Sequence, residues 1–242
     1  MSYSVKPKGY KTRKQWEAQG RRPVSPDVMK KYAAFDTCHP KYIHEYCGYE
    51  DTVPIIKEQD SAWPSADKRV IVFDTETTGL SRWDEVLQIS IVGSEGVVLD
   101  SYVRPVKRKS WPDAEAVNHI SPEMVSSYPT AKELASKIKE IFDSADVVVG
   151  HNVRFDIGVV EREFGVDFEG KVVIDTLKEF RKDVPSGKHK LEDAVRHYIP
   201  DRLGWFLAGA HDSKTDTIAT YEVFEEMGRQ RTRDVQNDME YV

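Results

Sequence analysis

Residues 71–80 read Ile-Val-Phe-Asp-Thr-Glu-Thr-Thr-Gly-Leu, an apolar run that ends in two carboxylates. Side chains two positions apart on a β-strand point to the same face. Asp74 and Glu76 are therefore expected to project together from the end of a buried strand. Two neighbouring carboxylates repel each other unless a positive charge lies between them, and hard oxygen ligands suit magnesium or manganese. The segment predicts a site for a divalent cation.

Apolar runs on either side of this segment outline one α/β domain. We expect strands at residues 70–73, 86–92, 97–103, 147–149 and 172–174. A capping box formed by Thr130 and Glu133 marks the start of one helix, and further helices are predicted for residues 153–164, 190–198 and 213–227. Three strands in hairpin order, followed by alternating helices and strands, indicate a mixed sheet covered by helices.

Two later segments carry acids that could join the first pair. Asp156 closes the sequence His-Asn-Val-Arg-Phe-Asp and falls in the first turn of a predicted helix. His211 and Asp216 lie at the start of the last predicted helix. On one helix, residues five apart would point about 140° from each other. Convergence on one site therefore requires His211 to lie on the preceding loop, which the small residues Gly204, Gly209 and Ala210 favour.

The first 66 residues differ from the rest of the chain. Residues 1–31 hold nine Lys or Arg against only Glu17 and Asp27. We expect an irregular, basic, aromatic-containing extension at residues 1–66, with one short helix at 26–34 where Ser25 would cap. Its charge is either that of a solvated tail or that of a surface for nucleic acid or a protein partner. The catalytic domain is predicted at residues 67–230 and a polar tail at 231–242.

The bulk composition is typical of a soluble globular protein, with 39% hydrophobic and 31% charged residues. No apolar run approaches the roughly 20 residues that span a bilayer, and the N-terminus lacks the apolar core of a signal peptide. These features predict no membrane association and a cytoplasmic protein. The net charge of −6 differs from that of a generally basic nucleic-acid binder, but cations in an acidic site would reverse its local sign.

The two cysteines, Cys38 and Cys47, make a disulfide framework improbable. With His39 and His44 they could bind zinc, because thiolate and imidazole are its usual ligands. The spacing Cys-x5-His-x2-Cys matches no strong zinc pattern, so free thiols are the favoured interpretation.

In order along the chain, three motifs resemble those of the DEDDh 3′–5′ exonucleases, the family that includes the epsilon proofreading subunit of bacterial DNA polymerase III. They are Phe-Asp-Thr-Glu-Thr-Thr-Gly-Leu at 73–80, His-Asn-Val-Arg-Phe-Asp at 151–156 and His-x-x-x-x-Asp at 211–216. Weaker likenesses lie at 117–121 and 174–177, and the resemblance spans residues 69–228. Ser213 stands where the family usually has Ala, and Asn118-His119 replaces a His-Gly pair. Asp212 occupies the place of the tyrosine that defines the related DEDDy subgroup, which excludes that subgroup.

The resemblance implies a ribonuclease H-like fold with a five-stranded sheet of order 3-2-1-4-5. It also implies roles for particular side chains. The metal ligands would be Asp74, Glu76, Asp156 and Asp216, with His211 as the general base. Family members hold the terminal nucleotide on the turn after the second acid, which here implies Thr77, Thr78, Gly79 and Leu80. Further substrate-side candidates are Asn152, Phe155 and His119.

The chemistry of phosphodiester hydrolysis agrees with these assignments. Two cations about 3.5–4 Å apart can activate a water and neutralise the leaving oxygen, and an imidazole suits proton transfer near neutral pH. The sequence predicts a magnesium- or manganese-dependent 3′–5′ exonuclease that releases nucleoside 5′-monophosphates, with single-stranded DNA as the expected substrate. An RNA or oligonucleotide trimmer is an alternative, because the motifs do not distinguish the sugar. A proofreading or accessory subunit of a polymerase or replisome is another.

Overall fold

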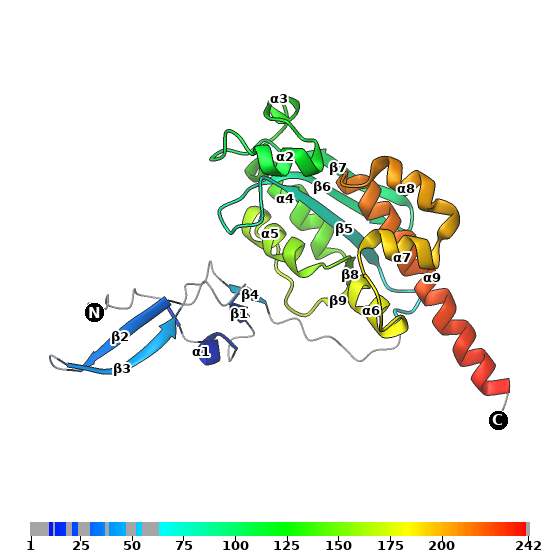
Figure 1. The fold of residues 1–242 in the computed structure, drawn as a ribbon, viewed down its shortest axis with the longest axis horizontal. Helices are drawn as coiled ribbons and strands as arrows, with labels where there is room; N and C mark the ends of the chain where they lie inside the picture. The colour runs from blue at the N-terminus through cyan, green and yellow to red at the C-terminus, as the bar shows by residue number, and fades with distance from the viewer. Residues whose placement is uncertain are drawn as a thin grey trace. The chain divides into compact units, whose positions relative to one another are not determined.

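The computed structural model describes residues 10–11, 13–17, 21–23, 30–36, 39–46, 52–54 and 63–240. The chain divides into two compact units, Met1–Lys57 and Glu58–Val242 (Figure 1). The predicted boundary lay at residue 66. Trp63 belongs to the second unit, where its ring stacks on Phe224 with 4.6 Å between centroids.

The first unit contains regular structure that was not predicted. Its described residues form two antiparallel strand pairs and one short helix. The elements are α1 (Arg13–Glu17), β1 (Arg21–Pro23), β2 (Lys30–Asp36), β3 (His39–Tyr46) and β4 (Thr52–Pro54). The predicted helix at 26–34 is wrong from Lys30 onward, because these residues form β2 and pair with β3. The Ser-Pro start signal is local, whereas this strand depends on a partner further along the chain. Cys38 and Cys47 lie outside the described residues, so the favoured interpretation of free thiols there stays a prediction.

The second unit is built on a five-stranded mixed sheet. Its strands are β5 (Val70–Thr77), β6 (Val86–Gly93), β7 (Gly96–Tyr102), β8 (Val147–Gly150) and β9 (Val172–Asp175). Their order is β7-β6-β5-β8-β9, with β5, β6 and β7 antiparallel and β5, β8 and β9 parallel. This confirms the predicted α/β, ribonuclease H-like sheet of order 3-2-1-4-5. Every residue of β6 and β8 is buried, as continuous apolar runs predict, whereas the edge strand β7 buries only Leu99.

Helices cover both faces of this sheet (Figure 1). They are α2 (Pro112–Asn118), α3 (Pro122–Val125), α4 (Ala131–Asp143), α5 (Arg154–Phe164), α6 (Thr176–Asp183), α7 (Leu191–Tyr198), α8 (Leu203–Gly209) and α9 (Ser213–Glu240), with a 3₁₀ turn at Pro200–Arg202. The predicted capping box of α4 is present. The loop predicted around Gly204 and Gly209 is wrong, since α8 occupies it. Helix α9 continues through the predicted tail as far as Glu240.

The alternation of side chains along β5 assigns each face of the sheet. Val72 packs in a buried cluster with Phe224 of α9, whereas Phe73 meets Phe142 of α4 edge-on at 4.9 Å. Because residues two apart share a face, Asp74 and Glu76 lie on the α9 side together with Val72. Among the described residues, no helix combines the length and the apolar character that crossing a bilayer requires.

Candidate metal centre and active site

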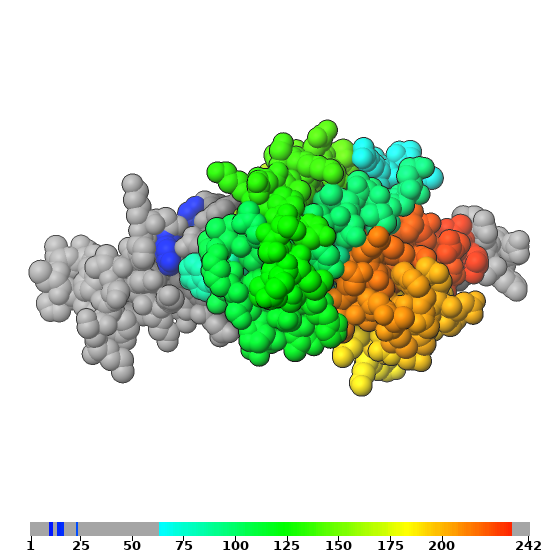
Figure 2. Space-filling model, turned by 90° about the horizontal axis from the view of Figure 1, so that it is seen from above, coloured from blue at the N-terminus to red at the C-terminus, as the bar shows by residue number. Residues whose placement is uncertain are grey.

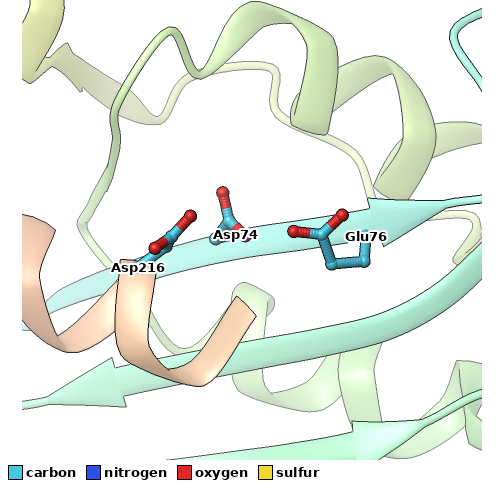
Figure 3. Close-up of side chains that lie close together, drawn as sticks. All are labelled: Asp74, Glu76 and Asp216. Carbon is cyan, nitrogen blue, oxygen red and sulfur yellow. The ribbon is translucent and has the colours of Figure 1, made fainter. Parts of the chain in front are cut away.

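Three carboxylates from two elements meet on the α9 side of the sheet. Asp74 and Glu76 rise from β5 and Asp216 from the first turns of α9, with the three side chains gathered together (Figure 3). One ligand oxygen from each lies within 4.8 Å of the others, and all three residues are half-buried. The structure thus brings together three of the four acids that the sequence selected.

Burial and mutual repulsion raise the pKa values of these three acids above their ordinary range. Burial raises the pKa of Glu76 to about 8, and the charge of Asp216 adds to the rise. Burial likewise raises the pKa of Asp216 to about 7, although the backbone N–H of His211 opposes this shift. The pKa of Asp74 is also raised, first by burial and then by the neighbouring acids. A divalent cation would relieve this repulsion, and an all-carboxylate donor set suits a hard cation.

Asp156 lies near this group but is not one of the three acids whose oxygens lie within 4.8 Å of one another. It is buried in the first turn of α5, and burial raises its pKa to about 7. Its Oδ1 accepts hydrogen bonds from the Thr75 amide at 3.1 Å and the Thr75 hydroxyl at 2.6 Å. Thr75 lies between Asp74 and Glu76 and therefore faces the opposite side of β5. Asp156 still raises the pKa of both, which places it within electrostatic reach of the group.

The start of α9 is fixed by hydrogen bonds that were not predicted from the sequence. The Ser213 hydroxyl donates to the Asp74 carbonyl at 2.8 Å. The Gln88 amide donates to Asp212 Oδ1 at 2.9 Å and accepts from the Ser213 N–H at 3.4 Å. Asp212 Oδ2 in turn accepts from the Thr215 N–H at 3.2 Å. These contacts position Asp216 over β5. The available signal was Gln88, which with Ser90 is one of two polar residues inside an otherwise apolar strand.

His211 occupies a tight turn between α8 and α9. Its backbone has a φ of 69°, in the left-handed region, and its N–H donates to Asp216 Oδ1 at 3.4 Å. The residue is exposed. The predicted placement of His211 before the helix and Asp216 on it agrees with the structure, although the connection is a turn rather than a long loop.

The turn after Glu76 is shaped by its own threonines. The Thr77 hydroxyl donates to the Gly79 carbonyl at 2.6 Å, and the Thr78 hydroxyl donates to Asp84 Oδ1 at 3.0 Å. A Cβ on Gly79 would lie 2.7 Å from Asp84 Oδ2, so only glycine fits this approach. Leu80 projects from the turn with 87% of its surface exposed.

The remaining substrate-side candidates lie on nearby segments. Asn152 is exposed with a φ of 62°, and its N–H donates to Asp175 Oδ1 at 2.8 Å. Phe155 is half-buried, and His119 is exposed at the end of α2. Its neighbour Asn118 is buried. The Asn118 side chain donates to the Thr77 carbonyl at 3.3 Å, and its hydrogen bond to Glu76 opposes the rise in the pKa of Glu76. The residue predicted from the sequence was its exposed neighbour, His119.

The sheet order and the acidic group together define a nuclease fold with a carboxylate site suited to divalent metal. Residues 71–224 match the family model described as exonuclease. The chain belongs to this exonuclease family, which confirms the predicted family and enzyme class.

Relatives and solved structures agree with this assignment. The DNA polymerase III PolC-type of Staphylococcus saprophyticus is 31% identical over 191 residues, which cover 75% of this chain and 13% of that protein. The Staphylococcus aureus protein of the same name is 32% identical over 193 residues with the same coverage. This chain thus spans 13% of the length of these relatives. Escherichia coli exonuclease I in complex with a dA16 oligonucleotide matches with a TM-score of 0.58 and 20% identity, covering 69% of this chain and 42% of that chain. Its complex with a dT13 oligonucleotide gives a TM-score of 0.56 and 20% identity, covering 71% of this chain and 43% of that chain. At this identity the structures show a shared fold.

Proposed function

We propose that this protein is a cytoplasmic, metal-dependent 3′–5′ exonuclease that acts on single-stranded DNA. The observation that carries the proposal is the group of Asp74, Glu76 and Asp216, whose oxygens lie within 4.8 Å of one another. Relatives carry a polymerase name, and the E. coli exonuclease I structures hold oligonucleotides. Both observations support a DNA substrate.

The same three carboxylates would hold the metal, with Asp156 as a fourth ligand once its side chain leaves Thr75. Two ions, magnesium or manganese, would supply charge neutralisation and a more acidic water at the scissile phosphate. The donor set fits such ions because each ligand is a carboxylate oxygen. Burial, and then the charge of neighbouring acids, raises the pKa values of Glu76 and Asp216, and a bound cation would oppose both effects.

The other residues of the site act on the substrate and on the transferred proton. The His211 imidazole accepts a proton from the water as the water oxygen bonds to phosphorus. The bond from phosphorus to the 3′ oxygen breaks, that oxygen takes up a proton, and a nucleoside 5′-monophosphate leaves. Backbone groups of Thr77, Thr78 and Gly79 receive the terminal 3′ hydroxyl, while Leu80 packs against the last base. Further contacts to base, sugar or phosphate would come from Phe155, Asn152 and His119.

Digestion of an end-labelled strand tests the proposal. A 5′-labelled single-stranded DNA should shorten stepwise from its 3′ end with magnesium or manganese and stay intact with a chelator. Cleavage at internal positions, or hydrolysis that persists in the chelator, would contradict it. A matched RNA strand in the same assay decides between DNA and RNA, because faster loss of RNA would favour the trimming alternative.

A second candidate function is proofreading beside a polymerase. The observation that favours it is the match to relatives named as DNA polymerases, of which this chain covers a small part. A proofreading enzyme should remove a mismatched 3′ terminus of a primed duplex faster than a matched one, and the protein should co-purify with a polymerase. Equal rates on the two termini, together with purification free of polymerase, would leave the stand-alone exonuclease as the better description.

A further inference from the structure

Three successive basic residues lie on a loop beside the substrate turn. The loop runs from residue 104 to 109, between β7 and α2, and carries Lys107, Arg108 and Lys109, each of them exposed. The stretch from residue 100 to 130, green in Figure 2, covers much of the viewed face of the catalytic unit. The metal-dependent mechanism proposed above gives this loop no role.

One buried carboxylate ties the loop to the substrate turn. The Glu85 side chain accepts hydrogen bonds from the N–H groups of Val106 at 2.7 Å, Lys107 at 2.8 Å and Arg108 at 2.7 Å. The Glu85 carbonyl accepts from the Thr78 N–H at 2.8 Å. Glu85 is thus bonded through its side chain to the basic loop and through its backbone to the turn expected to hold the terminal nucleotide.

Neighbouring contacts fix the same arrangement. The Arg108 guanidinium lies 3.2 Å from Asp84 Oδ1, and Asp84 Oδ2 accepts from the Ser81 N–H at 2.8 Å. On the far side of the loop, Trp111 is buried and its ring N–H donates to the Ile120 carbonyl at 2.7 Å. The loop backbone is therefore held in place. Lys107 and Lys109 are both exposed, and Lys109 Nζ donates one hydrogen bond to the Val106 carbonyl at 2.9 Å, which leaves two of its three N–H donors for a phosphate.

One large aromatic side chain, Trp83, is exposed immediately before Asp84, the partner of Arg108. Trp83 is 62% exposed, and the Arg82 guanidinium lies 4.4 Å from its ring centroid. Surfaces that combine cationic side chains with exposed aromatic rings bind single-stranded nucleic acid, because the charges follow the phosphates and the rings stack on bases. Such charge is needed here, since an acidic metal site repels a polyanion until cations fill it.

We propose that Trp83, Lys107 and Lys109 form a strand-binding surface for the nucleotides on the 5′ side of the terminal one. Trp83 stacks on a base, and the two lysines contact consecutive phosphates. The chemical class of the ligand is a single-stranded polynucleotide, and the inference rests on the proposed function. Arg108 is left out of the surface because its ion pair with Asp84 supports the turn.

The salt dependence of binding tests the lysines without any turnover. In a chelator, the affinity for a fluorescent single strand is measured at several salt concentrations for the wild type and for Lys107→Ala/Lys109→Ala. Loss of two phosphate contacts should flatten the slope of log affinity against log salt by about 1.4. The matched control, Lys132→Ala/Lys137→Ala, removes two exposed lysines of α4 and should keep the wild-type slope. An unchanged slope in the loop variant would overturn the proposal.

Trp83 is tested in the same assay. Trp83→Ala should weaken binding by between about fivefold and about a hundredfold, and Trp83→Phe should restore most of the affinity, because stacking needs an aromatic face. Equal affinity of the alanine variant and the wild type would contradict the stacking role.

Turnover separates this inference from the proposed function. The loss of kcat/KM in the double lysine variant should grow with substrate length and be smallest for a dinucleotide, which has no phosphate beyond the scissile one. If the protein hydrolyses strands from the 3′ end but the double lysine variant has an unchanged salt slope, the strand-binding surface is overturned and the proposed nuclease activity stands. If the wild type hydrolyses no strand but the double lysine variant has a flattened salt slope, the proposed nuclease activity is contradicted and the strand-binding surface is supported.

Discussion

Asp74 and Glu76 reach the same side of β5 because strand side chains alternate, and this part of the site could be predicted from six letters of sequence. The group that each carboxylate contacts could not be predicted in the same way. Asp156 was correctly placed in the first turn of α5, yet its hydrogen bonds to Thr75 depend on which face of β5 it approaches. Local patterns predict where a side chain begins, whereas the group that it contacts depends on tertiary packing.

His211→Ala tests the proposed base. Removing a general base should lower kcat by about 10²- to 10⁴-fold. KM and strand affinity should stay close to wild type, because the imidazole is exposed and the hydrogen bond from His211 to Asp216 comes from the backbone N–H, which alanine keeps. Steady-state kinetics over a range of pH would measure this. Turnover equal to wild type would remove His211 from the mechanism.

At the scale of elements, α9 owes its position to a polar side chain from a neighbouring strand. Gln88 of β6 bonds both Asp212 and the Ser213 N–H, and so holds the helix that carries Asp216. Long apolar runs made the strands predictable, because burial on both faces needs continuous apolar sequence. Short helices such as α8 were missed, since their packing against α7 and α9 outweighs the breaking tendency of Gly204 and Gly209.

Gln88→Ala should loosen the first turn of α9 and displace Asp216. Residues that orient metal ligands typically contribute 10- to 100-fold to metal affinity or activity, so we expect a drop of about that size in kcat, with a higher magnesium requirement. Magnesium titration of activity would show it. Gln230→Ala, further along the same helix, is the control and should match the wild type; an unaltered magnesium requirement for Gln88→Ala would argue against a positioning role.

The contact between Trp63 and α9 makes a prediction about stability. A Cβ on Gly228 would collide with the Trp63 ring, which is also stacked on Phe224 and covered by Arg231 at 4.5 Å. Gly228→Ala should therefore lower the free energy of unfolding by about 1–3 kcal/mol. Gly204→Ala, also in a helix but with open space around it, should be neutral or raise it by up to about 1 kcal/mol. Urea unfolding measures both variants. A free energy of unfolding for Gly228→Ala equal to that of the wild type would mean that the Trp63 ring moves aside without cost.

Across the whole molecule, the acidic group links folding to pH and to metal. In the folded protein the pKa values of Asp216 and Glu76 rise from 3.8 and 4.5 to about 7 and about 8. Between about pH 4 and about pH 8 the folded state therefore binds more protons than the unfolded chain. The free energy of unfolding falls as the pH rises through this range. Below about pH 4 the contribution is fully present, and above about pH 8 it is lost.

Unfolding in a chelator should therefore require less urea at about pH 8 than at about pH 5. Magnesium should reverse this loss, by about 2.7 kcal/mol at a hundredfold excess over its dissociation constant, with a smaller effect at low pH where protons compete. Glu76→Gln should flatten the pH dependence. A metal-free protein whose stability is constant across this range would contradict the coupling.

The carboxylate of Glu85 satisfies three consecutive amides of the 104–109 loop and makes no demand on the side chains that those residues carry. The backbone of residues 106–108 is thereby held without help from the Lys107 side chain, whereas Lys109 Nζ also donates to the Val106 carbonyl. An engineer could exchange Lys107 for a neutral or acidic residue, retuning which polymers the enzyme accepts, without redesigning the turn beside the metal.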